Sequence, residues 1–416
     1  MTAWPAPYAS RPVTAVVRVP GSKSATARAL VLSALASGDG FIKGGLLARD
    51  TALMIAGLTA LGARIDTDDP AAWQIQPITG DPAATTIDCG LAGTVMRFLP
   101  PIAAQGEATV HFIGDQAASA RPMLPLIEAL AQLGARVEGT AIPCTVTGPV
   151  TGRTVVIDSS ASSQFISGLL LAGPRFPRGL TVTHRGPAIP SLPHIGMTLA
   201  ALRARGVDIR QEGSTWEVPA CPVNALDESI EPDLTTAAVF LAAALVTAGR
   251  VTVPGWPAVT TQPGVRIAQI LAQMGASVEF SADGLTVAGT GQISGIDLDL
   301  HETSELTPVV AALAALADTP SRLRGVAHIR GHETDRLAAL CTQISALGGD
   351  CRETEDGLAI HPRPLQAGRF CTYGDHRMAH AGALLGLRVT GIRLDDVACT
   401  SKTMPEFPVV WENLVR

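Results

Sequence analysis

The hydrophobic and polar positions of this chain repeat in a unit of roughly 70 residues. In each unit a stretch with helical periodicity ends at a glycine, and an apolar, strand-like segment begins directly after it. These glycines are Gly62, Gly134, Gly206, Gly275 and Gly348. Glycine in this place suits the left-handed conformation that ends many helices. Self-similarity at a fixed period predicts a repeat architecture, in which each unit buries its apolar face against its neighbours.

A turn and a second strand are expected after the first strand of a unit. Asp283-Gly284 is a turn signal, and the apolar segment 285–288 follows it. The same arrangement recurs at Asp356-Gly357, ahead of 358–360. Helices alternating with short paired strands indicate an α/β fold.

Five copies of the repeat unit can be recognised by their glycines, and we expect a sixth unit to be split between the chain ends. Residues 407–416 would supply its helix and residues 14–19 a strand. Both ends of the chain would then lie in one domain, 1–20 with 228–416, while 21–227 form the other. A length of 416 residues agrees with two domains.

The composition narrows the class of protein. The chain is 47% hydrophobic and 16% charged, which is typical of a well-buried globular protein. Its net charge of −6 gives no indication of a nucleic-acid or membrane partner. Seven scattered cysteines without a Cys-x-x-Cys motif favour reduced thiols in the cytoplasm, with no disulfide or zinc site. The first residues show no signal peptide, and the apolar segment 237–248 is too short to span a membrane.

Lysine is rare, with only three among the 31 basic residues. Lys23 and Lys402 lie in similar small-polar loops, Gly21-Ser-Lys-Ser24 and Thr400-Ser-Lys-Thr403. A compact ammonium is not interchangeable with the planar guanidinium of arginine. Serine hydroxyls and backbone N–H groups at a helix start, together with lysine, form a typical anion site. For Lys23 the alternative is an ordinary capped helix with an exposed cation, and we interpret Lys43 as a chance surface lysine.

Further loops place donors or charges directly before apolar helices. They contain Gly93, Arg121, the run Ser162-Ser163-Gln164, the segment 332–336 and the segment 375–377. Each also has a simpler interpretation, as turn glycines, a solvated arginine, helix caps or an internal ion-pair cluster. No metal site is expected. His376 and His380 are spaced four residues apart, but the glutamate that metalloproteases have between two such histidines is missing.

The cations of these loops stand out against an acidic protein. They are Lys23, Arg28, Arg121, Arg336, Arg377 and Lys402. If they converge, their mutual repulsion would require one or two multiply charged anions. Phosphate and carboxylate both suit the bidentate contacts of arginine.

The motifs also occur in a known order. They are Pro20-Gly-Ser-Lys-Ser24, Leu91-Ala-Gly-Thr-Val-Met-Arg97, Arg121-Pro-Met123, Ser162-Ser-Gln-Phe165, Glu333-Thr-Asp-Arg336, Gly374-Asp-His-Arg-Met-Ala379 and Ser401-Lys-Thr403. This order, from about residue 14 to about residue 410, resembles that of the EPSP synthases within the enolpyruvyl transferases. The resemblance implies a two-lobed enolpyruvyl transferase fold, in which each lobe has three βαβαββ units with helices packed inside sheets, and an active site in the cleft between the lobes.

The resemblance further implies an activity. The enolpyruvyl group of phosphoenolpyruvate would pass to the 5-hydroxyl of shikimate 3-phosphate by addition and elimination, with release of phosphate and no cofactor. The product would be 5-enolpyruvylshikimate 3-phosphate, of the shikimate pathway to the aromatic amino acids. Glyphosate would compete with phosphoenolpyruvate, and we expect a monomer without nucleic-acid or membrane partners.

Site residues follow from the same resemblance. Shikimate 3-phosphate would be bound by Lys23, Ser24, Arg28, Ser162, Ser163, Gln164, Ser191, Glu305, His328 and His332. Phosphoenolpyruvate would be bound by Lys23, Gly93, Arg121, Gln164, Arg336, Arg377 and Lys402. Glu305 would be the base, and Lys23 or Glu333 would protonate C3 of phosphoenolpyruvate. The lobe 21–227 would be the shikimate 3-phosphate side, and the lobe with both chain ends the phosphoenolpyruvate side.

The chain departs from the family pattern at several of these positions. Glu305 stands where aspartate is common, His332 where lysine is usual and His328 where asparagine is usual. Two other functions stay open. One is enolpyruvyl transfer to UDP-N-acetylglucosamine, although the loop 114–121 lacks the cysteine usual in that family. The other is a non-catalytic anion-binding protein on the same fold.

Overall fold

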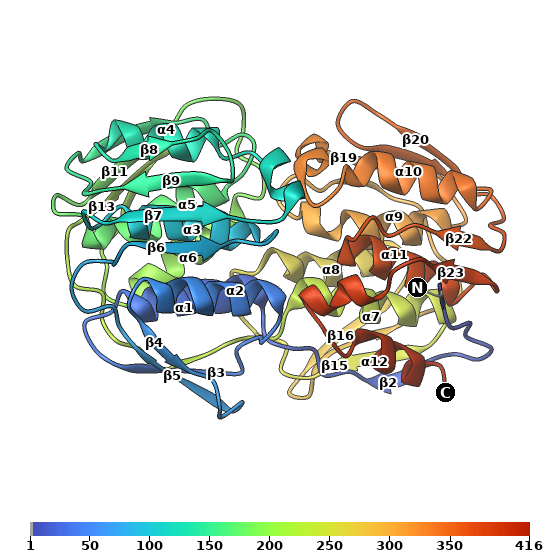
Figure 1. Ribbon diagram of the computed structural model, residues 1–416. Coiled ribbons are helices and arrows are strands. Elements are labelled where there is room, and N and C mark those ends of the chain that lie inside the picture. Colours follow the sequence, from blue (N-terminus) through green and yellow to red (C-terminus); the bar gives the residue numbers. More distant parts are fainter. Residues whose placement is uncertain (1–2) are drawn as a thin grey trace. The chain divides into compact units, whose positions relative to one another are not determined.

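The structure is a computed structural model that describes residues 3–416, and the chain divides into two compact units (Figure 1). One unit comprises Met1–Pro20 with Glu231–Arg416, and the other comprises Gly21–Ile230. Each unit has its own hydrophobic core. We call them the terminal unit and the central unit, and each is described by itself.

The central unit contains three repeats, each built on a four-stranded mixed sheet. The elements of the first repeat are α1 (Lys23–Ala34), β3 (Gly40–Lys43), α2 (Arg49–Ala60), β4 (Arg64–Asp66), β5 (Ala72–Gln76) and β14 (Glu228–Ser229). Those of the second are β6 (Thr85–Asp88), α3 (Gly93–Ala103), β7 (Thr109–Ile113), α4 (Leu124–Gln132), β8 (Arg136–Glu138) and β9 (Cys144–Thr147). Those of the third are β10 (Thr154–Ile157), α5 (Gln164–Ala172), β11 (Leu180–His184), α6 (Pro193–Ala204), β12 (Arg210–Glu212) and β13 (Thr215–Val218).

The terminal unit contains the other three repeats. The fourth has β2 (Thr14–Val16), α7 (Leu234–Thr247), β15 (Arg250–Val253), α8 (Ile267–Gln273), β16 (Ser277–Ser281) and β17 (Gly284–Ala288). The fifth has β18 (Asp297–Asp299), α9 (Thr307–Ala315), β19 (Ser321–Arg324), α10 (Arg336–Ala346), β20 (Asp350–Glu353) and β21 (Leu358–His361). The sixth has β22 (Gly368–Phe370), α11 (His376–Gly386), β23 (Ile392–Leu394), α12 (Phe407–Leu414) and β1 (Trp4–Pro5).

The first strand of a repeat pairs parallel to the strand after the first helix. In the second repeat β6 pairs with β7, and in the fifth β18 pairs with β19. Two repeats take their first strand from a distant part of the chain. β14 pairs with β3, so residues 228 and 229 complete the first repeat of the central unit. β2 pairs with β15 in the same way in the terminal unit.

This pairing corrects the expected composition of the sixth unit. The helix predicted over 407–416 is confirmed as α12, but the strand predicted within 14–19 belongs to the fourth repeat. The sixth sheet is instead completed by β1, which pairs antiparallel with β23. A two-residue strand has no alternation for a sequence pattern to reveal.

The five repeat glycines have the backbone conformation that the pattern predicted. Their φ angles are +111° at Gly62, +97° at Gly134, +81° at Gly206, +107° at Gly275 and +91° at Gly348. Left-handed φ angles are open to glycine without the steric cost that a side chain brings. The repeat period therefore reflects one helix ending used five times.

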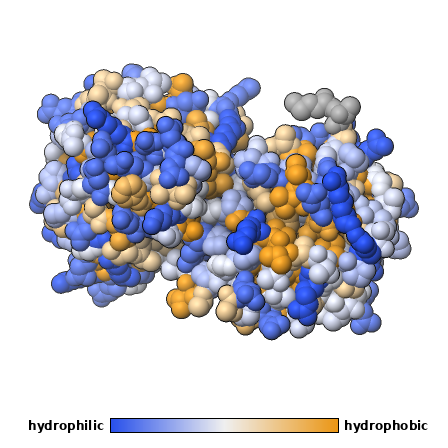
Figure 2. Space-filling model, turned by 90° about the horizontal axis from the view of Figure 1, so that it is seen from below, coloured by the Kyte–Doolittle hydropathy of each residue, from blue (hydrophilic) through white to orange (hydrophobic). Residues whose placement is uncertain are grey.

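The first helix of a repeat is buried and the second is amphipathic. Every residue of α3, α9 and α11 is buried, whereas α4 buries only one face. The fold class predicted from the motifs, with helices packed inside sheets, is thereby confirmed. In the residues that the structure describes, no helix is long and apolar enough to cross a membrane. Figure 2 shows one face of the molecule, on which hydrophobic groups lie in patches among hydrophilic ones.

Candidate active site

The predicted site residues stand where helices begin. Lys23, Gly93 and Gln164 are the first residues of α1, α3 and α5, Arg336 is the first of α10, and Arg377 is the second of α11. A helix start presents unpaired backbone N–H groups and a partial positive charge, which favour anions. The motifs found in the sequence are therefore helix N-termini of the repeats.

Lys23 is held by an acidic residue of the neighbouring helix. Its Nζ lies 3.1 Å from Oδ2 of Asp50, whose side chain is almost fully buried. The Ser22 hydroxyl caps α1 by accepting a hydrogen bond from the amide of Ala25. The simpler interpretation, a capped helix start, is thus part of the arrangement, but the lysine is an ion-paired group and not a loose surface cation.

Arg28 is buried and is held by neutral acceptors. Its Nε donates to the Thr198 hydroxyl, Nη1 to the Ser24 carbonyl and Nη2 to the His194 carbonyl, each at 2.8 Å. The guanidinium also lies over the ring of Phe98, 5.4 Å from its centroid. Burial lowers the pKa of Arg28 to about 9, so the group stays charged near neutrality at a cost in desolvation. A bound anion would offset that cost.

Three predicted residues meet at the start of α3. A Cβ placed on Gly93 would lie 3.0 Å from Nη2 of Arg121, Nη1 of Arg97 and Oε1 of Gln164. Arg121 is oriented by a 2.9 Å hydrogen bond from its Nη1 to the Leu91 carbonyl. Nε of Arg121 and Oε1 of Gln164 are buried without a hydrogen-bond partner in the described structure. Unused polar atoms around a glycine at a helix start are typical of a ligand site.

The predicted serines of the central unit serve partly as helix caps. The Ser162 hydroxyl accepts a hydrogen bond from the amide of Gln164 at 3.2 Å. Ser163 is buried, and Ser191, two residues before α6, has a φ of +51°. A left-handed serine is uncommon and costs backbone strain, and such strain concentrates at functional sites.

The terminal unit has an ion-pair cluster centred on Arg336, which is 1% exposed. Arg336 donates through Nε to Asp375 at 2.7 Å, through Nη1 to Glu305 at 2.8 Å and through Nη2 to Glu333 at 3.0 Å. Burial works to lower the pKa of Arg336, but the three carboxylates outweigh it and raise the pKa well above its ordinary value. The internal ion-pair cluster, which was the alternative for these motifs, is therefore present.

Two more predicted cations join the cluster. Nζ of Lys402 lies 2.6 Å from Oε1 of Glu333, and Nε of Arg377 lies 3.8 Å from Oε2 of Glu305. Nη1 of Arg377 is buried without a hydrogen-bond partner in the described structure. Asp375 caps α11 and accepts from the amide of Arg377.

The expected repulsion between converging cations is wrong for this unit. Its three predicted cations face carboxylates: Arg336 and Arg377 lie next to Glu305, and Lys402 pairs with Glu333. The cations could be recognised from their loops in the sequence. Glu305 lies outside those loops and reaches the cations only in the folded chain.

Glu305 is an ionised carboxylate next to two histidines. Burial works to raise its pKa, but the charges of Arg336, in the first place, and of Arg377 hold the pKa well below its usual value. Nδ1 of His332 lies 3.5 Å from Oε1 of Glu305, and the ring of His328 is 5.9 Å from that of His332. Burial, followed by the effect of His332, lowers the pKa of His328 to about 3, so His328 is neutral.

Several residues that hold this arrangement were not among the predicted site residues, although two of them lie in the quoted motifs. They are Asp50, Arg97, Thr198 and Asp375. Asp375 could have been found, because an aspartate directly before a helix is a typical cap. The others act across tertiary contacts that no local pattern reports.

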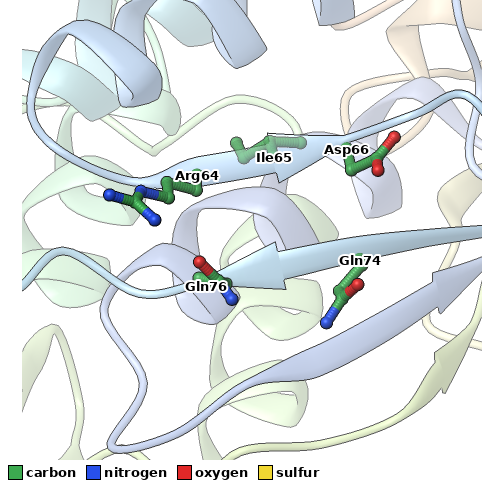
Figure 3. A pocket seen from close by; sticks show the side chains of 5 residues that line it. All are labelled: Arg64, Ile65, Asp66, Gln74 and Gln76. Carbon is green, nitrogen blue, oxygen red and sulfur yellow. The ribbon is translucent and has the colours of Figure 1, made fainter.

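A surface hollow lies elsewhere, over the hairpin of β4 and β5 (Figure 3). It is lined by Arg64, Ile65, Asp66, Gln74 and Gln76. No predicted site residue is among them, and we assign it no role.

The repeats and the charged helix starts define an enolpyruvyl transferase. The family model of EPSP synthase (3-phosphoshikimate 1-carboxyvinyltransferase) matches residues 7–411, and the chain belongs to this family. The resemblance read from the motifs is confirmed.

Solved structures of related proteins share the fold. Two structures of EPSP synthase from Acinetobacter baumannii are 24% and 25% identical to this chain, with TM-scores of 0.80 and 0.79. In both comparisons 99% of this chain and 97% of the other are covered. The enolpyruvyl transferase NikO from Streptomyces tendae is 19% identical, with a TM-score of 0.76 and coverage of 99% and 98%.

The family assignment gives the reaction. The chain transfers the enolpyruvyl group of phosphoenolpyruvate to shikimate 3-phosphate, as predicted. Transfer to UDP-N-acetylglucosamine, the nearest alternative, is not favoured.

Proposed function

We propose that the central unit provides most of the contacts to shikimate 3-phosphate. The residues that would bind it there are Lys23, Ser24, Arg28, Ser162, Ser163, Gln164 and Ser191. Arg28 carries this proposal, because it is a buried cation that donates hydrogen bonds to a hydroxyl and two carbonyls. An anion at Arg28 would add the charge that the protein itself does not supply there.

Phosphoenolpyruvate, in this proposal, is bound by two groups of donors. Gly93, Arg121 and Gln164 form the group at the start of α3. Arg336, Arg377 and Lys402 form the cationic part of the cluster in the terminal unit. The phosphate and carboxylate of phosphoenolpyruvate would take donors of Arg336 and Lys402 that now face Glu305 and Glu333, so these acids act as internal substitutes for the substrate.

The chemistry is an addition followed by an elimination. The 5-hydroxyl oxygen forms a bond to C2 of phosphoenolpyruvate while Glu305 takes the hydroxyl proton, and C3 receives a proton from Glu333 or Lys23. The resulting intermediate then loses a proton from C3, the bond from C2 to the phosphate oxygen breaks, and the double bond is restored. Phosphate leaves, and atoms and charges balance.

Substrate binding would also strengthen the base. Glu305 is a weak base in the described structure because the charges of Arg336 and Arg377 stabilise its carboxylate. When an anion engages the same cations, their effect on Glu305 falls and its pKa rises toward its ordinary value. The site would become basic only when phosphoenolpyruvate is bound.

The test is to incubate the purified protein with both substrates and analyse the products by mass spectrometry. The proposal predicts a species with the mass of shikimate 3-phosphate plus phosphoenolpyruvate minus phosphoric acid, together with free phosphate. Neither product above a no-enzyme control, with no binding of either substrate, would leave only a non-catalytic anion-binding protein.

We further propose that the protein is a cytoplasmic monomer. All seven cysteines are unpaired in the structure, which agrees with a reducing compartment. Light scattering coupled to size-exclusion chromatography would test the oligomeric state, with a mass near 43.0 kDa expected. Twice that mass would overturn the monomer.

A further inference from the structure

His332 lies between two groups that make opposite demands on the same nitrogen. Nδ1 of His332 is 3.1 Å from Nη1 of Arg336 and 3.5 Å from Oε1 of Glu305. A guanidinium has only donors, so a hydrogen bond from Arg336 requires a lone pair on Nδ1. A carboxylate has only acceptors, so a hydrogen bond to Glu305 requires a proton on Nδ1. The two bonds cannot exist at the same time.

The shorter distance assigns the state present here. At 3.1 Å the contact with Arg336 is a hydrogen bond, whereas 3.5 Å to Glu305 is an electrostatic contact. Nδ1 is then unprotonated, the imidazole is neutral, and its proton is on Nε2. His332 is 20% exposed at its side chain, so it can exchange protons with solvent.

Arg336 and Glu305 are charged groups in direct contact with Nδ1 of His332. Its third neighbour, His328, has its ring 5.9 Å away and is neutral. Behind His328 lies His301, with its ring 5.7 Å from that of His328. Other charged groups contact Arg336 and Glu305 in turn.

The charged groups that contact Arg336 and Glu305 in turn include Glu333, Asp375 and Arg377. Glu333 and Asp375 occupy the other donors of Arg336, and Arg377 faces the Oε2 side of Glu305. A ligand that draws Arg336 away would remove its hydrogen bond to Nδ1, and the Nδ1 lone pair would then face Oε1 of Glu305.

We propose that His332 is a positioning residue that accepts, through Glu305, the proton of the substrate hydroxyl. This inference rests on the proposed role of Glu305 as base. Before binding, Arg336 keeps Nδ1 unprotonated. When phosphoenolpyruvate takes the donor of Arg336, the Nδ1 lone pair faces Glu305, and the proton that Glu305 removes from the hydroxyl passes from its carboxyl oxygen to Nδ1. Glu305 is a carboxylate again, paired with an imidazolium that loses its proton to solvent before the next turnover.

A lysine at this position could not do the same near neutrality, because its ammonium is already protonated. The histidine therefore makes proton acceptance dependent on pH. An imidazole that is protonated in advance cannot take the proton, so turnover should fall on the acid side of the pH profile as His332 becomes charged.

The kinetic test compares pH profiles of kcat and KM for the wild type, His332→Gln, His332→Lys and His301→Gln. We expect the acid limb of kcat to disappear, or to move by at least about one pH unit, in both His332 variants. At pH 7.5 kcat should fall about tenfold in both, with KM for either substrate changed less than about threefold. His301→Gln is the matched control in the same row of histidines, and it should keep the wild-type limb.

A wild-type acid limb in His332→Gln would overturn the proposal, as would loss of the limb in the His301 control. His332→Lys guards against a folding defect in the glutamine variant, and circular dichroism would check both. A purely structural role would lower kcat at every pH without moving the limb.

A second measurement does not need turnover, so it separates failure of this inference from failure of the proposed function. In protein with ¹⁵N-labelled histidine, the Nδ1 signal of His332, assigned by its loss in His332→Gln, should be that of an unprotonated nitrogen at pH 8. Glu305→Gln should lower the pKa of His332 by about one unit, since a nearby carboxylate stabilises the imidazolium. A protonated Nδ1 at pH 8, or a pKa unaffected by Glu305→Gln, would overturn the inference even in an active enzyme.

Discussion

The two units hold their cations in different ways. In the central unit, Arg28 and Arg121 donate to carbonyl and hydroxyl oxygens, which fix their position and leave their charge uncompensated. In the terminal unit, Arg336 and Lys402 are held by carboxylates, which fix and neutralise them together. A cation held by neutral acceptors can bind an anionic ligand directly. A cation paired with a carboxylate can bind the ligand only when the ligand replaces that carboxylate. Under the proposed function, we call Arg28 and Arg121 the prepared half-site, and Arg336 and Lys402 the exchanging half-site.

Among the predicted site cations of the central unit Lys23 is an exception, because it pairs with Asp50 at 3.1 Å. Lysine has one compact charge and no fork of fixed donors, so a carbonyl pair cannot orient it as it orients arginine. An acid is the simpler way to position it. The contrast between the units therefore applies to arginines first.

The largest effect is expected from the acid of the terminal unit that has a chemical role. Glu305→Gln should lower kcat about a thousandfold while KM for both substrates changes less than about fivefold, because an amide cannot take the hydroxyl proton. Steady-state phosphate release would measure both quantities. Glu302→Gln, an exposed neighbour, is the control and should behave as wild type. Turnover within tenfold of wild type in Glu305→Gln would remove Glu305 as the base.

The next largest effect is a difference in the loss of stability when an arginine is removed from one unit or from the other. Arg336→Met leaves three acids without their cation and should lower the free energy of unfolding by about 3–5 kcal/mol. Arg28→Met leaves only neutral acceptors and should cost no more than about 1–2 kcal/mol. Urea denaturation would compare both with Arg352→Met, an exposed control expected within about 0.5 kcal/mol of wild type. Equal losses for Arg336→Met and Arg28→Met would break the comparison.

A single methyl group tests the prepared half-site. Gly93→Ala places Cβ 3.0 Å from Arg121, Arg97 and Gln164, so these side chains must shift. We expect KM for phosphoenolpyruvate to rise about tenfold, with little change for shikimate 3-phosphate. Gly196→Ala in α6 is the matched control, since nothing lies within 4 Å of its Cβ. An unchanged KM in Gly93→Ala would mean that phosphoenolpyruvate does not bind there.

The smallest effect is expected from a buried polar side chain of the terminal unit, His380. Both ring nitrogens of His380 are buried without a hydrogen-bond partner in the described structure, and the ring lies 4.6 Å from that of Phe407. His380→Met should therefore stabilise the protein by about 1 kcal/mol, measured by thermal or urea unfolding. A loss of stability would show that the ring is needed where it is.

The same residue gives a pH dependence. Burial, with a smaller effect of Arg377 and Arg336, lowers the pKa of His380 well below its ordinary value. An unfolded histidine takes up a proton near pH 6.5, so below that pH the unfolded state binds more protons than the folded state. Stability should fall as the pH drops below about 6.5, and His380→Met should lose less stability than wild type over the same range.

Much of the fold could be predicted because the repeat has a local cause. A left-handed glycine at each of five helix ends is set by local backbone geometry, and the sequence shows it directly. The strands β1, β2 and β14 could not be assigned to their sheets in the same way. They are two or three residues long and pair with strands far away in the sequence, so neither length nor alternation identifies their partners.

The candidate site likewise has a part that the sequence pattern reveals and a part that it does not. Lys23, Gly93 and Gln164 could be found because helix starts rich in small and polar residues are visible in the sequence. Their charge balance could not, because Asp375 reaches Arg336 across 39 positions and Glu305 across 31. Motifs locate the donors, whereas the fold decides which acids compensate them.

The most direct test of the exchanging half-site is the affinity of Glu333→Gln for phosphoenolpyruvate, measured by isothermal titration calorimetry beside wild type. Glu333 holds Lys402 at 2.6 Å and Arg336 at 3.0 Å, so its loss frees donors that the substrate otherwise has to win from it. We predict binding about tenfold tighter than wild type, even though turnover falls. Equal or weaker binding would contradict the claim that the carboxylates of the terminal unit stand in for the substrate.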